Sequence, residues 1–197
     1  YGMCKAISER IITSAGYLNP GNVTYLCTRY GNVLESRGSI IPLFKYQAEN
    51  QDHLTVTDPD MTRFVMTLDD SVDLIEEALA RGQTGQTWIP ILPAMRIGDL
   101  AEIFAEQHGK GIKTIGLRPG EKKHEDLVNE SESVRTVRST TSPHYIIGPA
   151  LGNLEGKRFT YTSSDDVMSK EQLRAHLQEL GILDAPLDAF KGKSIEE

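Results

Sequence analysis

The chain has 197 residues, of which 39% are hydrophobic and 25% charged, with a net charge of -7, which is an ordinary globular composition. We find no signal-peptide pattern and no apolar run near the ~20 residues that a membrane span needs. The acidic balance disfavours a nucleic-acid partner. Two cysteines make no disulfide framework, so we expect a reducing, cytoplasmic location.

Tyr1 and Lys5 stand four residues apart at the start of a helical pattern. Residues at that spacing share a helix face, so the Lys5 ammonium would lie beside the Tyr1 phenol and lower its pKa toward neutrality. Such a pair suits proton and hydride chemistry, although both residues are common and the pair alone is a weak signal. Apolar residues continue at helical spacing to Ala15, and Gly16 is the expected C-cap of a helix of about sixteen residues.

The segment 23–29 is an apolar, β-rich run without alternation, which predicts a strand covered on both faces of a parallel sheet. Further along, helical and extended patterns alternate. Helices are predicted for 40–49, 68–81, 96–107 and 169–180, and strands for 54–56, 62–67, 85–91, 113–117 and 144–147. This order indicates an α/β fold.

Some of these segments carry signals for their faces and ends. The helix 68–81 has one stripe of Leu68, Val72, Ile75 and Leu79, and the helix 96–107 directs Ile97, Leu100, Ala101 and Phe104 inward. The last helix has Ser169 as N-cap, Gln172 at its third position and Gly181 as terminator. Ser, Thr, Glu and Arg dominate 129–142, which is the composition of an exposed or partly mobile loop.

Two segments early in the chain suit a nucleotide. Asn32 follows the predicted strand 23–29 and would place an amide at the carboxyl end of a sheet strand, where α/β folds bind ligands. The segment Ser36–Ser39 runs into the helix 40–49, where hydroxyls, a guanidinium and helix-start amides suit a diphosphate. A plain Gly-Asn turn and an N-cap loop remain the alternatives.

Two later segments add charged groups. Arg118 can clamp a phosphate while Glu121 accepts hydrogen bonds from sugar hydroxyls, the alternative being a turn with a surface ion pair. Arg63 follows Asp58-Pro59-Asp60, which is mainly turn chemistry. None of the four segments is convincing alone.

Their order is more specific, because it resembles that of the extended short-chain dehydrogenase/reductase superfamily. The matching motifs are Tyr1-x-x-x-Lys5, Arg29-Tyr-Gly-Asn-Val, Ser36-Arg-Gly-Ser-Ile-Ile-Pro-Leu-Phe, Thr57-Asp-Pro-Asp-Met-Thr-Arg-Phe and Arg118-Pro-Gly-Glu-Lys-Lys-His-Glu. More narrowly, the chain resembles the polysaccharide-biosynthesis branch that contains inverting UDP-N-acetylglucosamine 4,6-dehydratases. The resemblance covers about residues 1–127 well, and the tail is more loosely similar to the capsule-synthesis members.

The resemblance implies roles for the matching residues. Tyr1 would take the proton from the sugar 4-hydroxyl as hydride leaves C4 for NADP (or NAD), and Lys5 would hold the nicotinamide ribose. Val33 would lie near the nicotinamide. Water would then be lost from C5 and C6, and hydride would return to C6. The implied substrate-binding residues, which would hold diphosphate, ribose or uracil, are Asn32, Ser36, Arg37, Gly38, Ser39, Pro42, Arg63, Arg118 and Glu121.

The resemblance also implies the architecture, namely the carboxy-terminal part of a Rossmann-like fold with a smaller substrate-binding subdomain. Residues 1–127 would end the Rossmann-like domain interleaved with the nucleotide-sugar-binding subdomain, and 128–197 would form an extension. The Gly-rich dinucleotide loop and the elimination residues would precede Tyr1. We therefore expect exposed apolar faces on the first helix and on 23–29, no turnover by this chain alone, and a homo-oligomer at full length.

Two departures and two alternatives accompany this interpretation. Glu35 puts a carboxylate beside the diphosphate segment, and Lys123 replaces an expected apolar residue. A UDP-sugar 4- or 5-epimerase and a non-catalytic nucleotide-binding module both remain open. The five histidines are scattered, which predicts no metal site. No nucleophile elbow or phosphate loop is present, which excludes the common hydrolase and NTPase patterns.

Overall fold

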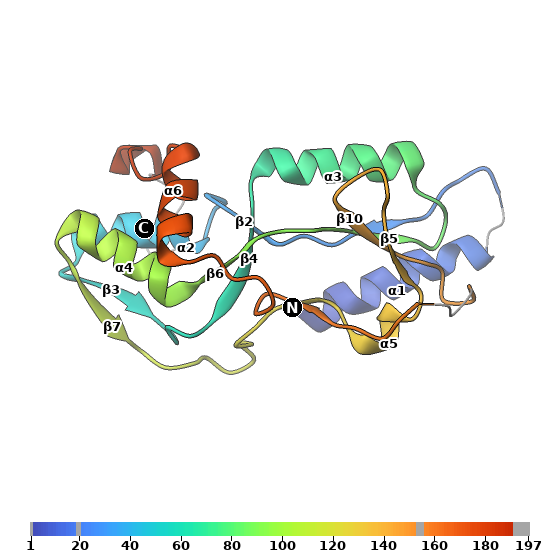
Figure 1. The fold of residues 1–197 in the computed structure, drawn as a ribbon, viewed down its shortest axis with the longest axis horizontal. Coiled ribbons are helices and arrows are strands. Elements are labelled where there is room, and N and C mark those ends of the chain that lie inside the picture. The colour runs from blue at the N-terminus through green and yellow to red at the C-terminus, as the bar shows by residue number, and fades with distance from the viewer. Residues whose placement is uncertain (1, 19–20, 153–155, 191–197) are drawn as a thin grey trace. The chain divides into compact units, whose positions relative to one another are not determined.

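The computed structural model describes residues 2–18, 21–152 and 156–190 (Figure 1). They form two compact units that are each assembled from three stretches of the chain. The first unit comprises 1–31, 68–91 and 126–161, and the second unit comprises 32–67, 92–125 and 162–197. Within the described residues, no helix has the length and apolarity to cross a membrane.

The first unit is a small mixed sheet between two helices. Its elements are α1 (Gly2–Leu18), β1 (Cys27–Thr28), α3 (Leu68–Arg81), β5 (Thr87–Pro90), β8 (Asp126–Val128), α5 (Glu130–Ser133), β9 (Thr136–Arg138) and β10 (His144–Ile147). The sheet order is β1-β5-β10-β9, with β1 parallel to β5 and β10 antiparallel to both of its neighbours. The helices α1 and α3 flank this sheet from opposite sides (Figure 1). Leu74, Ala78 and Trp88 form a buried cluster under α3.

The second unit contains the larger core. Its elements are β2 (Asn32–Val33), α2 (Ile40–Asn50), β3 (His53–Val56), β4 (Thr62–Met66), β6 (Ala94–Arg96), α4 (Ile97–His108), β7 (Gly111–Thr114), α6 (Lys170–Glu179) and η1 (Leu187–Phe190). The strands form a three-stranded sheet β2-β4-β6 and a parallel pair β3-β7. Fully buried Phe44 of α2 and Phe104 of α4 meet edge to face, with ring centroids 5.9 Å apart.

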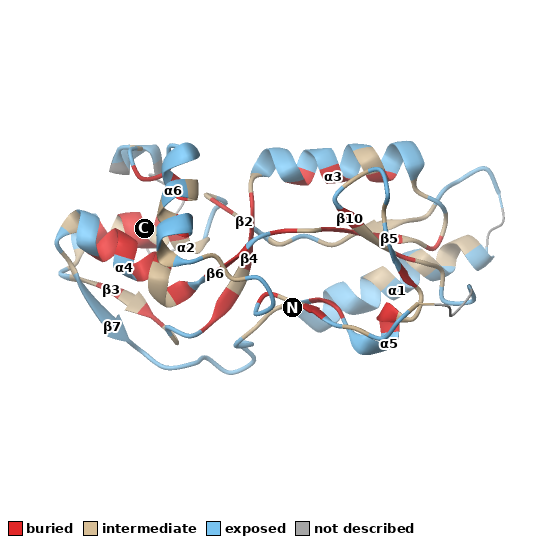
Figure 2. Ribbon diagram, in the orientation of Figure 1, coloured by how far each residue is buried: buried red, intermediate tan, exposed pale blue. Residues whose placement is uncertain are grey.

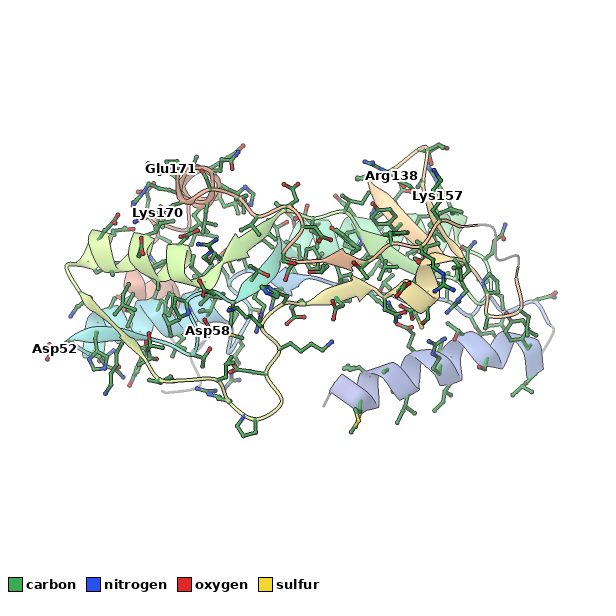
Figure 3. The ribbon with its side chains drawn as sticks, turned by 60° about the horizontal axis from the view of Figure 1, so that its bottom comes forward. Asp52, Asp58, Arg138, Lys157, Lys170 and Glu171 are labelled. Carbon is green, nitrogen blue, oxygen red and sulfur yellow. The ribbon has the colours of Figure 1, made fainter. Side chains whose placement is uncertain are left out.

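Most helices and several strands lie where their patterns predict them, which confirms the α/β class. The inward residues of α4, namely Ile97, Leu100, Ala101 and Phe104, are all buried. The last helix begins with the predicted capping box, in which Ser169 Oγ accepts from the Gln172 N–H. Gly181 follows that helix in the left-handed region at φ 69°. On α6, the Lys170 ammonium also pairs with Glu102 and Glu106 of α4, each at 2.6 Å (Figure 3).

Two predictions for the start of the chain are wrong. Gly16 lies inside α1 rather than capping it, and a Cβ at this position would stand 1.9 Å from Thr84 Cγ2. The glycine therefore permits close packing of α1 and not its termination. The strand predicted over 23–29 is limited to Cys27–Thr28, which is half-buried, because β1 pairs with β5 alone among the described strands. Val23 is 60% exposed, so this segment is not covered on both faces.

Two further boundaries are corrected. The predicted strand 113–117 forms earlier as β7, because it pairs in parallel with β3 from the register His53↔Gly111. The polar segment 129–142 is not a plain loop, since it contains α5 and β9. Asn129 caps α5 by accepting from the Glu132 N–H, and the Glu132 side chain returns to the Asn129 N–H. The polar composition of 129–142 does not reveal that the side chains of Asn129 and Glu132 each accept a hydrogen bond from the other residue's N–H.

Much of α1 and α3 is exposed (Figure 2), and the exposed residues include large apolar side chains. On α1, Ile7 and Ile11 are 60% and 62% exposed, as expected for that helix. On α3, the buried residues are Ser71, Leu74 and Ala78, whereas the stripe predicted from periodicity faces outward. That stripe consists of Leu68, Val72, Ile75 and Leu79.

Gly98 in the first turn of α4 provides a test of the packing. Its N–H donates to the Pro59 carbonyl at 2.8 Å, and an added Cβ would stand 2.8 Å from that same oxygen. We expect Gly98→Ala to lower the free energy of unfolding by about 1–3 kcal/mol through overpacking, against the helix preference for alanine of ~1 kcal/mol. Gly2→Ala in α1 is the control, because nothing lies within 4 Å of its added methyl. Urea denaturation measures both, and equal midpoints would contradict the packing described here.

Candidate functional site

The second unit encloses a cavity of about 240 Å³. It is lined from β2, the segment before α2, the turn before β4, β6, the start of α4 and the segment around Glu121. Predicted site residues that line it are Asn32, Val33, Gly38, Ser39, Arg63 and Glu121. Its other lining residues, which the sequence reasoning did not single out, are Leu34, Ile40, Ile41, Thr57, Met61, Met95 and Ile97. The cavity therefore has an apolar wall and a set of converging polar groups.

Strand pairing brings these distant segments together. β2 runs parallel to β4 with Asn32 opposite Val65, and β4 runs antiparallel to β6 with Arg63 opposite Met95. Asn32 therefore does not follow the strand of 23–29, as predicted, but begins a short strand of its own. Two residues are too few for a periodic pattern to reveal a strand. The Leu34 N–H then donates to the Met66 carbonyl at 2.9 Å and extends the pairing.

Ser39 occupies the N-cap position of α2 but makes no capping hydrogen bond. Its Oγ is buried and has no hydrogen-bond partner in the described part of the chain. A buried hydroxyl without a partner is costly unless a ligand or water satisfies it. The first amides of a helix also lack intrahelical acceptors and favour an anion. Ser39 and the start of α2 thus present donors to the cavity they line.

The Arg63 side chain makes several hydrogen bonds within the second unit. Its guanidinium donates to the carbonyls of Thr62 at 2.7 Å, Lys122 at 2.9 Å and Lys123 at 3.2 Å, and its Nε lies 3.3 Å from a Glu125 oxygen. The side chain is 13% exposed. These bonds tie the segment that follows Glu121 to β4. A direct phosphate contact by Arg63 stays a prediction.

The two departures from the expected pattern find local explanations. The Lys123 ammonium lies 3.8 Å from an Asp58 oxygen and 3.5 Å from an Asp60 oxygen, so it pairs with the turn before β4 (Asp58 is labelled in Figure 3). Glu35 has a left-handed backbone at φ 61° and does not line the cavity.

Burial lowers the pKa of Lys45, and the charges of Asp184 and Glu35 oppose that shift.

Four of the predicted substrate-binding residues lie outside the cavity lining. The Ser36 hydroxyl donates to the Val33 carbonyl at 2.9 Å, and Arg37 is exposed. Pro42 is buried within the packing of α2. Arg118 is exposed, and its N–H donates to the Glu121 carboxylate at 3.0 Å, so the segment forms a turn. Their roles toward a ligand stay predictions.

Lys5 lies in the first unit, exposed on α1, whereas Tyr1 is outside the described residues. One turn beyond Lys5, the Glu9 carboxylate receives two hydrogen bonds from Arg29, at 2.7 and 2.8 Å. Arg29 donates equally to Glu132, at 2.7 and 2.9 Å. Burial alone would raise the pKa of the Glu132 carboxyl, but the hydrogen bonds and charge of Arg29 hold it below its ordinary value. Sequence reasoning missed this cluster, since Arg29 and Glu132 are 103 residues apart in the chain.

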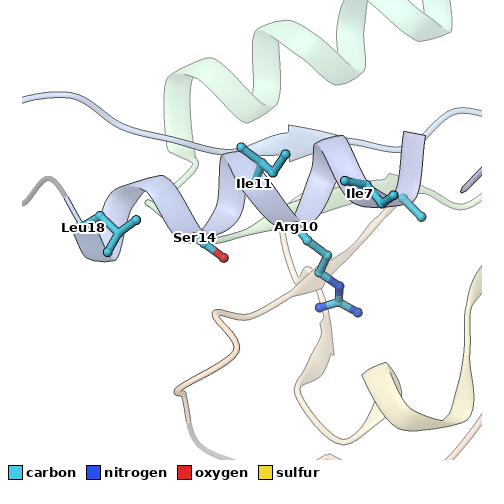
Figure 4. Close-up of a pocket in the computed structure, with 6 residues that line it drawn as sticks. Ile7, Arg10, Ile11, Ser14 and Leu18 are labelled. Atoms are coloured by element: carbon cyan, nitrogen blue, oxygen red, sulfur yellow. The ribbon is translucent and has the colours of Figure 1, made fainter. Parts of the chain in front are cut away.

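A second hollow is lined by α1 alone (Figure 4). Ile7, Ile11 and Leu18 supply most of its apolar surface, with Arg10 and Ser14 beside them. A ligand site needs walls that converge around the ligand, and one convex helix supplies none. We therefore treat this hollow as an open helix face. No group of three or more metal-ligating side chains occurs among the described residues.

Comparison with known proteins gives consistent results. Residues 1–147 match the model of a family described as polysaccharide biosynthesis protein. The UDP-glucose 4-epimerase of Rickettsia typhi is 42% identical over 137 residues, which are 68% of this chain and 40% of that protein. The solved structure of Pen from Bacillus thuringiensis is 37% identical with a TM-score of 0.84, over 92% of this chain and 58% of that one.

A more distant structure, a dTDP-glucose 4,6-dehydratase from Bacillus anthracis in complex with NAD, shows the fold alone. It is 20% identical with a TM-score of 0.51, and the match covers 60% of this chain and 40% of that one. The chain thus spans between 40% and 58% of the length of these relatives.

Ser39 and Ser169 form a matched pair for testing whether the Ser39 hydroxyl serves the fold. Ser169→Ala removes a capping bond and should lower the free energy of unfolding by about 1 kcal/mol. Ser39→Ala removes a buried hydroxyl that has no partner, so we expect no loss and a slight gain in stability. Thermal and urea denaturation of both variants measure this. A loss for Ser39→Ala equal to that for Ser169→Ala would show that Ser39 caps α2 after all.

Proposed function

The chain belongs to the polysaccharide biosynthesis protein family, within the extended short-chain dehydrogenase/reductase superfamily, and we propose that it is the nucleotide-sugar-binding part of a nucleotide-sugar 4,6-dehydratase. UDP-N-acetylglucosamine is the proposed substrate, with inversion at C5. The observation that carries the proposal is the cavity of the second unit, where predicted residues from four separate segments line one space.

The chemistry of this cavity supports a phosphorylated, hydroxyl-rich ligand. The unpartnered Ser39 hydroxyl and the start of α2 suit phosphate oxygens, and the Glu121 carboxylate suits donating hydroxyls. Met61 and Met95 offer apolar contact to a ring face. Ligand pockets usually measure roughly 300–1,000 Å³, so a cavity of about 240 Å³ holds part of a nucleotide sugar and leaves the rest outside it.

Lys5 and Tyr1 are the proposed catalytic pair. The Tyr1 phenolate would remove the proton from the sugar 4-hydroxyl, while Lys5 lowers the pKa of that phenol. The dinucleotide, NADP or NAD, supplies the hydride acceptor when bound. Lys5 and Val33 are the described residues proposed to touch it, which is too small a set to hold a dinucleotide. We therefore propose that turnover requires an additional dinucleotide-binding segment and that this chain alone is inactive.

The epimerase alternative has its own support. The relative from Rickettsia typhi that is 42% identical bears the name UDP-glucose 4-epimerase. A 4-epimerase would use the same Tyr and Lys chemistry, so the described residues favour neither reaction. A nucleotide-binding module without turnover is the third reading. A homo-oligomer and a cytoplasmic location remain part of the proposal.

Calorimetry with UDP tests the binding claim. We expect this chain to bind UDP, and Ser39→Ala and Arg118→Ala each to weaken binding about tenfold or more, since a hydrogen bond to a charged group contributes about 1.5–3 kcal/mol. Arg138→Ala is the matched control, because Arg138 is an exposed arginine of the first unit (Figure 3). Unchanged affinity in Ser39→Ala would contradict binding in the cavity, and unchanged affinity in Arg118→Ala would contradict a phosphate contact by Arg118.

Product analysis separates the three readings. The chain is assayed with UDP-N-acetylglucosamine and NADP, alone and together with the dinucleotide-binding half of a relative. We expect no turnover alone and, in the assembly, a product that has lost one water and gained a 4-keto group. A C4 epimer of unchanged mass would instead support the epimerase. Binding without turnover in the assembly would support the module, and turnover by the chain alone would contradict our proposal.

A further inference from the structure

We propose that Arg29 is a positioning residue that fixes the turn of α1 bearing Lys5, by clamping Glu9 of α1 onto Glu132 of the first unit's frame. The inference rests on the proposed function for the chemistry of Lys5. The clamp itself is visible in the structure whatever the reaction proves to be.

Apolar packing does not hold α1 in place. None of its described residues is buried, and its large apolar side chains point outward. At its far end, Gly16 approaches Thr84, and the Tyr17 hydroxyl accepts a long bond of 3.4 Å from the Leu151 N–H. A helix without a buried face gains little stability from the hydrophobic effect. Within this chain, the position of α1 therefore depends on directed polar contacts.

Arg29 supplies such contacts with every donor it has. A guanidinium carries five N–H groups in a rigid fork. Two of them meet the Glu9 carboxylate, two meet the Glu132 carboxylate, and one donates to the Leu127 carbonyl at 2.6 Å. Bidentate pairing fixes the orientation of both partners as well as their distance. No donor of this side chain remains for a ligand.

The two carboxylates have different roles in the clamp. Glu132 is 3% exposed, belongs to the capping box of α5 and so forms part of the rigid frame. Glu9 is 18% exposed and belongs to α1. Glu9 stands one helical turn from Lys5, on the same side of the helix. The position of the Lys5 turn is thus set mainly through Glu9 and Arg29, beside a longer contact of 3.4 Å from the exposed Arg10 of α1 to Glu132.

A purely structural ion cluster is the competing explanation. Glu9→Gln separates the two, because it weakens the link to α1 and leaves the Arg29 pair with Glu132 intact. If the cluster is purely structural, losing the Glu9 pair should destabilise the whole first unit. If Arg29 holds α1 in place, the loss should destabilise α1 alone. Glu130→Gln is the matched control, because it makes the same charge change in an exposed pair with Arg158 in the same unit.

Amide hydrogen exchange on this chain gives the first readout. In Glu9→Gln we expect the amides of α1 to exchange about tenfold faster or more, while those of β5 and β10 keep the parent rates. Glu130→Gln should leave both sets unchanged. Unaltered exchange in α1, or equal acceleration across the sheet, would overturn the inference. This readout requires no enzymatic activity.

Kinetics of the assembly with a dinucleotide-binding half give the second readout. Glu9→Gln should lower kcat about tenfold or more and leave KM for the nucleotide sugar nearly unchanged, because only the catalytic helix shifts. The acidic limb of the kcat pH profile should move to higher pH, since a displaced Lys5 no longer lowers the pKa of the Tyr1 phenol, which must be deprotonated to act as the base. Glu9→Asp should restore part of the rate, whereas a merely structural role would not move the pH profile.

The outcomes of these experiments distinguish the proposed function from the inference about Arg29. An inactive parent assembly contradicts the proposed function, and the exchange experiment then decides whether Arg29 clamps α1. An active parent with normal kcat and pH profile in Glu9→Gln contradicts the inference and leaves the proposed function standing.

Discussion

The short pairing of β2 with β4 and of β4 with β6 is the constraint on which the candidate site depends. Main-chain registers place Asn32 beside Val65 and Arg63 beside Met95. The bond from the Val65 N–H to the Pro93 carbonyl, at 2.9 Å, holds the strand that leads into β6. Strand pairing therefore brings three sequence segments together around one cavity, and the side chains of these segments contribute to its lining. In the proposed function, polar groups of the ligand would meet residues whose positions the sheet already fixes.

In each unit, one arginine uses its side-chain N–H groups for hydrogen bonds within the protein and thereby links two segments. In the second unit, Arg63 binds the carbonyls of Lys122 and Lys123 and ties the turn containing Glu121 to β4. In the first unit, Arg29 binds two carboxylates and links α1 to α5. Both side chains are partly buried, at 21% exposed for Arg29 and 13% for Arg63, and removing a partner of either would leave hydrogen-bonding groups unsatisfied, at a cost of about 1–3 kcal/mol. Each guanidinium thereby holds in place a segment that carries a candidate functional residue.

Sequence patterns predicted the elements that carry strong local signals. The helices α2, α3, α4 and α6 and the strand β10 lie where local patterns predicted them. Patterns could not predict β2 or the short extent of β1, because two-residue strands exist only through their partners. They also predicted an apolar stripe on α3 that the structure leaves exposed, because periodicity shows a face but not what covers it.

The site residues came from the order of motifs, and strand pairing explains why Asn32, Ser39, Arg63 and Glu121 share a cavity. The contributions of Met61 and Met95 were not predictable, because no local pattern marks a methionine as part of a wall. The clamp on α1 was not predictable either, because Glu9, Arg29 and Glu132 meet only in the folded chain. Long-range ion pairs leave no trace in a single sequence.

A crystal structure of this chain with UDP is the most direct test of the central claim, which is that the second unit carries the nucleotide-sugar site. Our account predicts ordered density in the cavity, with a phosphate oxygen within hydrogen-bond distance of Ser39 Oγ at the start of α2 and a ribose or sugar hydroxyl near Glu121. Density at another surface of the chain, with the cavity empty and Ser39 still without a partner, would contradict it.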